Sequence, residues 1–368
     1  MNDSWFQRYL LPGLVFQSAI IAGAYGSGRE LAEFFLPFGP RGGLAGMVVT
    51  TLVFSLVLAA SFEFARRFQL FDYRSFMKKL LGPAWPLYEI LYLLLMLLVI
   101  SVIGASAGEI MRDTFGVPTM IGIIGIMVLI AVLVFYGTPA VERFFAVWSL
   151  VLYGAYLVFF GWNLAQHSGA IAANLTTIDT RPGWFASGLA YAGYNVAMVP
   201  ILLFCIRHLH TRREAVTAGL LGGPIAMIPA MLFFVAMIGQ YETLTGAADT
   251  VLPVTVLLNA ISGAGLFAYL FPMVLFGTFV ETGTAMIHGV NERFDHVLRE
   301  RGRSLSPWLR VAVALAILLS AIVIADVVGL TALVARGYGV ITYGFLLVFV
   351  LPVMTVGVWK LRKLENGD

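Results

Sequence analysis

The chain has 368 residues, of which 60% are hydrophobic and 12% are charged, and its formal net charge is +3. Soluble domains carry about 25% charged residues, so this composition excludes a soluble globular protein and predicts an all-α polytopic membrane protein. The single cysteine, Cys205, excludes a disulfide within the chain.

The first apolar segment, 10–37, is long enough to cross a bilayer but contains three glycines in the run GAYGSG at 23–28. Arg29, Glu30 and Glu33 follow this run. Glycine favours local unwinding, and unwound backbone or charges inside a bilayer are costly unless protein or a polar cavity covers them. The segment therefore predicts a discontinuous helix that holds a polar solute.

This interruption supplies most of the candidate solute-binding residues. They are Gly23, Tyr25, Gly26, Ser27, Gly28 and Glu30. The half-helix that starts near Gly28 presents its positive end to an anionic group such as a carboxylate, whereas the carbonyls that end the inner half suit a cation or an ammonium group. Arg29 and Glu33 stand at i,i+4, so we expect them to pair. The pair is a candidate gate; the alternative is a packing contact that never meets the solute.

The apolar runs that follow predict ten transmembrane helices in a single domain. The predicted spans are 10–37, 44–66, 85–110, 117–136, 141–165, 185–206, 214–239, 264–290, 308–326 and 338–360. The connections near 166–184 and 240–263 are too short to fold alone. Pro253 lies in an apolar stretch of the second connection, which predicts a short re-entrant or interfacial helix on the outer face.

Basic residues fix the expected orientation. With the N-terminus inside, the cytoplasmic segments hold 18 of the 23 lysines and arginines, and the remainder are Arg29, Arg41, Arg112, Arg181 and Arg336. Because positive residues accumulate on the cytoplasmic side, both termini are predicted to be cytoplasmic.

Span six carries a second interruption, in which Tyr191, Tyr194 and Asn195 surround Gly193 and precede Pro200. It lies five spans after the first, so the chain reads as a 5+5 inverted repeat, with repeat one at about 8–166 and repeat two at about 184–361. Tyr194 and Asn195 are further candidate solute-binding residues. The alternative for the tyrosines, and a serious one for Tyr191, is anchoring at the membrane interface.

Span eight offers a candidate ion-coupling site. Thr278, Glu281 and Thr282 stand at i, i+3 and i+4, so they share one helix face. Glu281 lies about halfway along the span, where a lone carboxylate demands a partner or a proton. Oxygen atoms of this face suit sodium, or Glu281 itself takes and releases a proton. The alternative is a glutamate locked in a structural hydrogen bond.

The opening FQSAIIAGAYGSGRELAEFF (16–35) and the stretch FGTFVETGTAMIHG (276–289) resemble the YkvI-type bacterial membrane proteins. More broadly, the chain resembles the amino acid–polyamine–organocation superfamily with the LeuT-like fold. That resemblance implies that interrupted helices one and six cradle a small, usually nitrogen-containing solute, and that a sodium site lies between helices one and eight. The family usually has a pair of hydroxyl residues at that site; here Glu281 stands in or beside the pair, which leaves sodium and proton coupling both open.

The leading hypothesis is a secondary active transporter that moves a small polar solute, an amino acid or other amine, by alternating access. Coupling to a proton or sodium gradient and a bacterial inner-membrane location go with it. The alternative is a membrane receptor that keeps the fold without transporting. No nucleotide-hydrolysis or common hydrolase motif occurs in the sequence. We therefore expect no enzyme activity, no cofactor and no nucleic-acid partner; the oligomeric state is left open.

Overall fold

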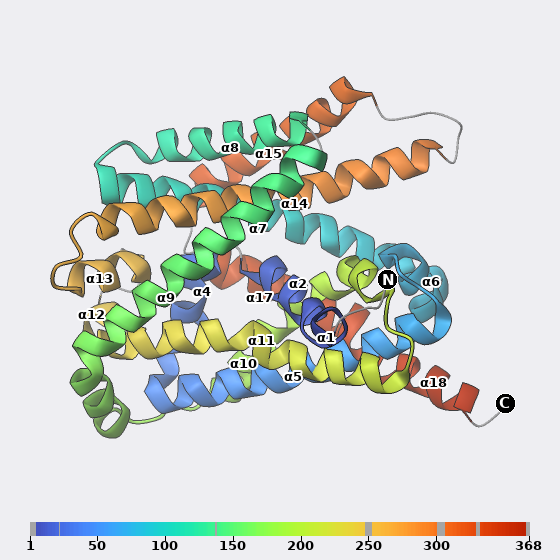
Figure 1. Cartoon of the computed structure of the whole chain (residues 1–368), viewed down its shortest axis with the longest axis horizontal. Helices are drawn as coiled ribbons and strands as arrows, with labels where there is room; N and C mark the ends of the chain where they lie inside the picture. The colour runs from blue at the N-terminus through green and yellow to red at the C-terminus, as the bar shows by residue number, and fades with distance from the viewer. Residues whose placement is uncertain are drawn as a thin grey trace.

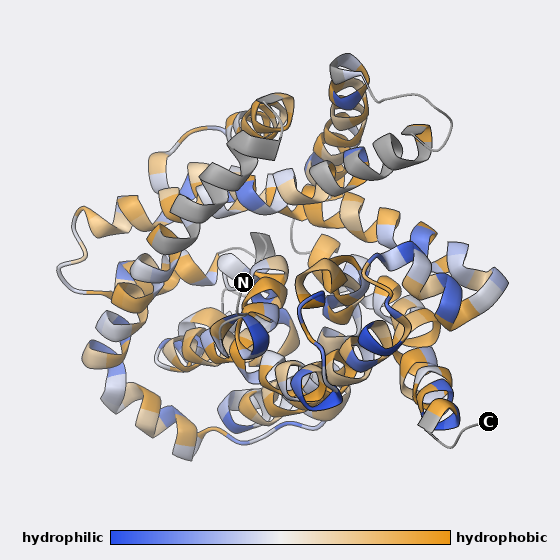
Figure 2. Ribbon diagram, turned by 45° about the vertical axis from the view of Figure 1, so that its right-hand side comes forward, coloured by the Kyte–Doolittle hydropathy of each residue, from blue (hydrophilic) through white to orange (hydrophobic). Residues whose placement is uncertain are grey.

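The structure is a computed structural model, and it describes residues 5–21, 23–136, 138–246, 252–299, 306–328 and 332–365. These residues form helices and no strand, which confirms the all-α prediction (Figure 1). Seven helical stretches are long and apolar enough, by length and composition, to cross a membrane, and α2 and α8 are shorter apolar helices. Hydrophobic residues predominate along the helices in Figure 2, as a lipid environment requires.

The long helices follow the predicted apolar runs. They are α5 (Gly39–Phe68), α7 (Trp85–Phe115), α8 (Thr119–Tyr136), α9 (Thr138–Thr177), α11 (Arg212–Ile238), α14 (Phe267–Arg299) and α15 (Pro307–Val328). The short connecting helices are η1 (Leu36–Phe38), α6 (Tyr73–Leu81), η2 (Gly82–Ala84), α12 (Tyr241–Gly246) and α13 (Pro253–Ala260). The last crossing comprises η4 (Leu333–Tyr338), α17 (Gly339–Phe345), η5 (Leu346–Val350), η6 (Val353–Gly357) and α18 (Val358–Glu365).

Two connections differ in detail from the sequence-based expectation. The predicted connection 166–184 is wrong over most of its length, because α9 continues as a helix to Thr177. The segment around Pro253 does form a short helix, and proline occupies its first turn, where its missing N–H costs no hydrogen bond. Its place on the outer face stays a prediction.

The first crossing is broken into pieces, as predicted. After α1 (Trp5–Tyr9), α2 (Leu11–Ile20) ends before the glycine run, α3 (Gly23–Gly26) forms one turn, and α4 (Arg29–Phe34) begins after Gly28. Gly28 has φ +81°, a left-handed conformation that residues with a Cβ rarely adopt. A Cβ there would lie 2.8 Å from Phe233 Cζ and 3.0 Å from Pro253 Cβ. Glycine is therefore required at this position by both backbone and packing.

This requirement gives a testable prediction. Gly28→Ala should destabilise the protein by about 1–3 kcal/mol, because alanine is strained in the left-handed conformation and meets Phe233. Gly26→Ala is the matched control, since its Cβ would make ordinary contacts at 3.4 Å or more. Thermal unfolding of the purified variants in one detergent measures the difference. Equal melting temperatures for the two variants would contradict the broken geometry.

The second interruption takes a different form from the one predicted. The helix α10 (Trp184–Asn195) passes directly into the 3₁₀ helix η3 (Val196–Ile206), so the crossing changes its helical geometry without a loop. Pro200, inside η3, cannot donate a backbone hydrogen bond, which weakens the α-helical ladder at this depth. The prediction of a discontinuous sixth helix is therefore correct in position, and the expected unwound segment is replaced by a tighter helix.

The second helix of each predicted repeat packs against the other at close range. A Cβ on Gly219 of α11 would lie 2.3 Å from the backbone nitrogen of Ala59 on α5. Gly223, one turn later, faces Ser55, whose hydroxyl donates a 2.9 Å hydrogen bond to the Leu220 carbonyl. Small residues at i and i+4 let membrane helices approach closely. The closely packed helices α5 and α11 therefore form a scaffold that supports the two broken crossings.

One end of the molecule gathers the residues predicted to be cytoplasmic. Arg8 pairs with Glu214 at 3.1 Å, and Arg66 donates to the His210 carbonyl at 2.9 Å. Glu214 and Thr211 form a capping box at the start of α11. In Figure 1 this end of α11 lies on the right with α6 and α18, whereas α12 and α13 lie on the left.

Candidate functional site

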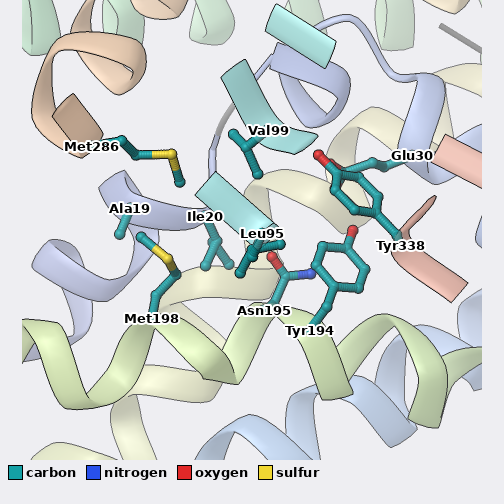
Figure 3. Close-up of a pocket in the computed structure, with 10 residues that line it drawn as sticks. All are labelled: Ala19, Ile20, Glu30, Leu95, Val99, Tyr194, Asn195, Met198, Met286 and Tyr338. Carbon is teal, nitrogen blue, oxygen red and sulfur yellow. The ribbon is translucent and has the colours of Figure 1, made fainter. Parts of the chain in front are cut away.

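A small cavity lies where the two interrupted crossings meet (Figure 3). Its lining residues are Ala19, Ile20, Glu30, Leu95, Val99, Tyr194, Asn195, Met198, Met286 and Tyr338. The volume is about 20 Å³, which is room for one water molecule. A solute larger than water would fit in this cavity only if lining side chains moved.

The breaks in the helices place the polar residues of this cavity. Ala19 and Ile20 end α2, and Glu30 lies in the first turn of α4 beyond the glycine run. Tyr194 and Asn195 are the last residues of α10, where the geometry changes to 3₁₀. The lining from α7, α14 and η3 is apolar. The polar groups of the cavity thus come from α4, from the end of α10 and from Tyr338 of η4, and the rest of its lining is apolar.

Glu30 is the charged residue of the cavity, and only 2% of its surface is exposed. Its Oε2 atom makes no hydrogen bond within the described structure. The hydroxyls of Tyr191, Tyr194 and Tyr338 lie close enough to interact with the carboxyl, but those of Tyr191 and Tyr194 form no hydrogen bond of ordinary geometry. In Figure 3 the Tyr338 ring lies beside the Glu30 side chain. A buried carboxyl with unused hydrogen-bonding capacity is energetically costly, which makes this cavity a candidate binding site.

Aromatic rings wall the site around this carboxyl. Tyr194 stacks on Tyr338 with ring centroids 4.4 Å apart, and Tyr191 meets Tyr194 edge to face at 5.6 Å. Phe34 and Phe35 of the first crossing pack on Tyr191 at 5.5 and 5.0 Å. Tyr191, at 0% exposure, therefore lies in the core and not at a membrane interface.

The structure brings Glu30, Tyr194 and Asn195 together, as predicted. Asn195 donates to the Tyr191 carbonyl at 2.9 Å through its amide nitrogen. In Figure 3 its amide oxygen points into the cavity. That oxygen is an acceptor for a solute.

The predicted residues of the glycine run lie outside the cavity lining. Gly26 faces Phe279 and Leu275 of α14, and its carbonyl accepts from Tyr156 at 3.3 Å. The Ser27 carbonyl accepts from the Val254 backbone at 3.0 Å.

The other predicted residues of the glycine run, Gly23, Tyr25 and Gly28, also lie outside the cavity lining. Gly23 begins α3, and Gly28 is covered by Phe233 and Pro253. Tyr25 is 1% exposed, and its hydroxyl, which lacks a hydrogen bond, lies close to Glu30. The glycine run therefore positions Glu30 and packs against α11 and α13, and the cavity lies outside the run.

The candidate gate residues do pair. Arg29 Nη2 lies 3.5 Å from Glu33 Oε2, and Arg29 is 4% exposed. Arg29 also interacts with Glu109 on α7, a residue that lies near Arg112. The guanidinium thus belongs to an acidic network on the α7 side and not to the Glu30 cavity. Whether the pair opens and closes stays a prediction.

A second small cavity lies between α2 and α14. Its lining residues are Ser18, Ile21, Leu152, Tyr153, Thr278 and Glu281, and its volume is about 20 Å³. Two of the three predicted ion-coupling residues, Thr278 and Glu281, therefore face the end of the first half-helix. Thr282 is buried, at 6% exposure, beside them but outside the lining.

The oxygen atoms of this second cavity suit a hard cation or a proton relay. Tyr153 donates to Gln17 Oε1 at 3.0 Å and lies close to Glu281. Thr278 donates to the Val274 carbonyl at 3.0 Å, which leaves its lone pairs available. No cluster of three His, Cys, Asp or Glu residues that could hold a transition metal occurs in the described ranges. The chemistry available here is oxygen coordination or carboxyl protonation.

Several residues of the Glu30 cavity were missed from the sequence. Met198, Met286 and Leu95 are ordinary apolar residues of predicted spans, so no local signal separated them from the rest of the core. Tyr338 was placed at the very start of the last span, because the helix was expected to begin there. In the structure Leu333–Tyr338 is already helical, so Tyr338 lies inside the crossing and not at its start.

The fold and the two cavities define the class of this protein: an all-helical membrane protein with the LeuT-like transporter fold, broken in its first crossing. No family model matches the chain. The chain is similar to the membrane protein YkvI of Bacillus subtilis (strain 168), with 23% identity over 229 residues, 61% of this chain and 64% of that relative. The match thus spans just under two thirds of the length of this curated relative.

Two solved structures establish the likeness of fold. A Na⁺-coupled sialic acid symporter in a substrate-bound, outward-open state aligns with TM-score 0.62 and 14% identity, over 92% of this chain and 78% of that one. MhsT in complex with L-phenylalanine aligns with TM-score 0.60 and 15% identity, over 96% of each chain. These two proteins bind different solutes on one fold, so the fold does not specify the solute of this protein. That solute has to be inferred from the residues of its own site.

Proposed function

We propose that this protein is a secondary active transporter of a small polar solute, an amino acid or other amine, driven by a proton or sodium gradient. The observation that carries the proposal is the pair of cavities at the break of the first crossing. One holds a buried carboxyl among tyrosines, and the other holds Thr278 and Glu281 against the end of α2. Adjacent solute and cation sites on a discontinuous helix are the parts that coupled transport needs.

The proposed architecture is ten crossings in two inverted repeats of five. Repeat one, about 8–166, comprises the broken first crossing, α5, α7, α8 and α9. Repeat two, about 184–361, comprises α10–η3, α11, α14, α15 and the last crossing. The packing of α5 on α11, the second members of the two repeats, supports this pairing. The basic end of the molecule supports cytoplasmic termini, and the bacterial relative, itself a membrane protein, supports a location in the bacterial cell membrane.

In this proposal Glu30, Tyr194 and Asn195 hold the solute, and Glu281 with Thr278 and Thr282 couples the ion. Arg29 and Glu33 form the gate. The two small cavities share the break after α2, so filling one changes the backbone that lines the other. That shared segment is a physical route for coupling.

An uptake experiment distinguishes a transporter from a receptor with the same fold. A thermal-shift screen of the purified protein over amino acids, amines and nucleobases, with and without sodium and across pH, finds the stabilising solute. That solute, radiolabelled, is then offered to proteoliposomes under an inward proton or sodium gradient. Accumulation against the solute's own gradient supports transport; binding without accumulation or counterflow would identify a receptor on the same fold.

A further inference from the structure

The charge balance of the Glu30 cavity points to a particular kind of solute. Among the described residues, the lining contains one acid and no lysine, arginine or histidine. The basic residue next in sequence, Arg29, is paired with Glu33 at 3.5 Å and lies near Glu109. The cavity therefore offers a carboxyl without a basic side chain to balance its charge.

The site lacks a counterpart for a carboxylate. A helix N-terminus was expected to receive one, but α4 has only six residues and its Gly28 end is covered by Phe233 and Pro253. None of residues 23–28 lines the cavity. A zwitterionic amino acid would bring a second carboxylate next to Glu30, in a site with few donors and no cation to balance it. Like charges buried together are strongly unfavourable.

The other walls of the cavity suit a positively charged group. The rings of Tyr194 and Tyr338, stacked at 4.4 Å, lie beside Glu30 and present aromatic surface to a cation. The amide oxygen of Asn195 points into the cavity and accepts a hydrogen bond. An ammonium group has three donors and no acceptor, so it matches a carboxyl, an amide oxygen and tyrosine hydroxyls together.

The apolar side of the cavity determines which non-polar part of a solute can fit. Met198 and Met286 face the carboxyl across the cavity in Figure 3, with Ile20, Leu95 and Val99 between them. Methionine is unbranched and adapts its shape, so these two side chains are the ones that move to admit a solute larger than water. A short alkyl or aryl group fits there without a polar partner.

We propose that the solute is a small monocationic primary amine, whose ammonium group binds Glu30 beside the stacked rings of Tyr194 and Tyr338 and whose apolar body lies against Met198 and Met286. This inference rests on the proposed function and narrows its solute from amino acids and amines to amines without a carboxylate. Glu30 is the residue that selects charge, and the methionines select size.

Three matched probes test the proposal: isobutylamine, L-valine and isobutanol, which share one branched alkyl group. Calorimetric titration of the purified full-length protein should give the tightest binding for isobutylamine, with L-valine and isobutanol at least about tenfold weaker. Equal or tighter binding of L-valine would overturn the inference. So would the absence of binding across primary amines from methylamine to phenethylamine.

Variants assign the effect to the carboxyl. Glu30→Gln keeps the shape and removes the charge, so isobutylamine affinity should fall by about 30-fold or more, as for a buried charge pair that loses one partner. Glu242→Gln, an exposed carboxyl on α12, should leave affinity unchanged. If Glu30→Gln fails to fold, Tyr338→Leu tests the ring, with an expected loss of about fivefold against Tyr338→Phe. Unchanged affinity in a folded Glu30→Gln, or in Tyr338→Leu, would overturn the assignment.

Uptake separates this inference from the proposed function. Amines that bind through Glu30 without gradient-driven accumulation in proteoliposomes would keep the inference and contradict transport. Accumulation of L-valine with no binding of amines would keep transport and overturn the inference.

Discussion

Replacing Gly219 by alanine should destabilise the fold by about 2 kcal/mol or more, although the same change elsewhere in a helix is neutral or stabilising. The new Cβ would lie 2.3 Å from the Ala59 nitrogen and 2.4 Å from the Ala59 Cα. These are backbone atoms, which no rotamer change can move, so α5 and α11 have to separate. Separation breaks the hydrogen bond from Ser55 to the Leu220 carbonyl and loosens the scaffold behind the site.

Gly161→Ala on α9 is the matched control, because nothing lies within 4 Å of its added Cβ. Alanine is a better helix former than glycine by about 1 kcal/mol, so this variant should be at least as stable as the parent. Thermal unfolding in one detergent, with size-exclusion profiles, compares the two. A Gly219→Ala protein as stable as Gly161→Ala would show that the helices are not held at this distance.

The sequence was sufficient to find the break in the first crossing, because glycines and charges inside an apolar segment are typical of a membrane helix that is broken around a polar site. Glu30 was identified for the same reason. The apolar runs also placed the long helices, since a bilayer requires continuous hydrophobic stretches. Both signals are local, and both depend on the cost of polar groups in lipid.

The remaining features depend on contacts between distant segments. Whether Gly28 faces the solute or Phe233 depends on how α4 rotates against α11, which no local pattern encodes. The position of Tyr338 follows from the helical segment Leu333–Tyr338 that precedes α17, and helix ends are the least certain part of a sequence-based prediction. The change from α10 to η3 was expected only as an interruption of the helix, because glycine and proline signal a break without specifying its form.

The close approach of α5 and α11 was present in the sequence as Gly219 and Gly223 but was not recognised. Small residues at i,i+4 are common in membrane helices, and the pattern has meaning only once a partner is known. Ser55 and Ala59 of α5 supply that partner in the structure. Packing specificity therefore had to come from the three-dimensional arrangement.

Glu281→Gln should abolish gradient-driven accumulation of the solute while solute binding persists. Glutamine keeps the size and shape of the side chain, but it cannot take up and release a proton and it has no charge to balance a sodium ion, so ion and solute movement become uncoupled. Glu281 lines the second cavity with Ser18, Tyr153 and Thr278 but does not line the Glu30 cavity, so we expect solute affinity to change less than it does in Glu30→Gln. The steady-state concentration ratio across the vesicle membrane should fall to about 1.

The measurement uses proteoliposomes under a pH gradient without sodium and, separately, under a sodium gradient at uniform pH. The gradient that drives accumulation by the parent protein identifies the coupling ion. If Glu281→Gln loses accumulation under that gradient but keeps counterflow, the coupling role belongs to Glu281. Thr282→Val is the companion variant: Thr282 is buried beside the cavity but does not line it, so a proton-coupled protein should tolerate this change. A Glu281→Gln protein that still concentrates its solute would leave Glu281 a structural role, and the coupling group would then have to be sought at Glu30, the carboxyl most deeply buried at the break.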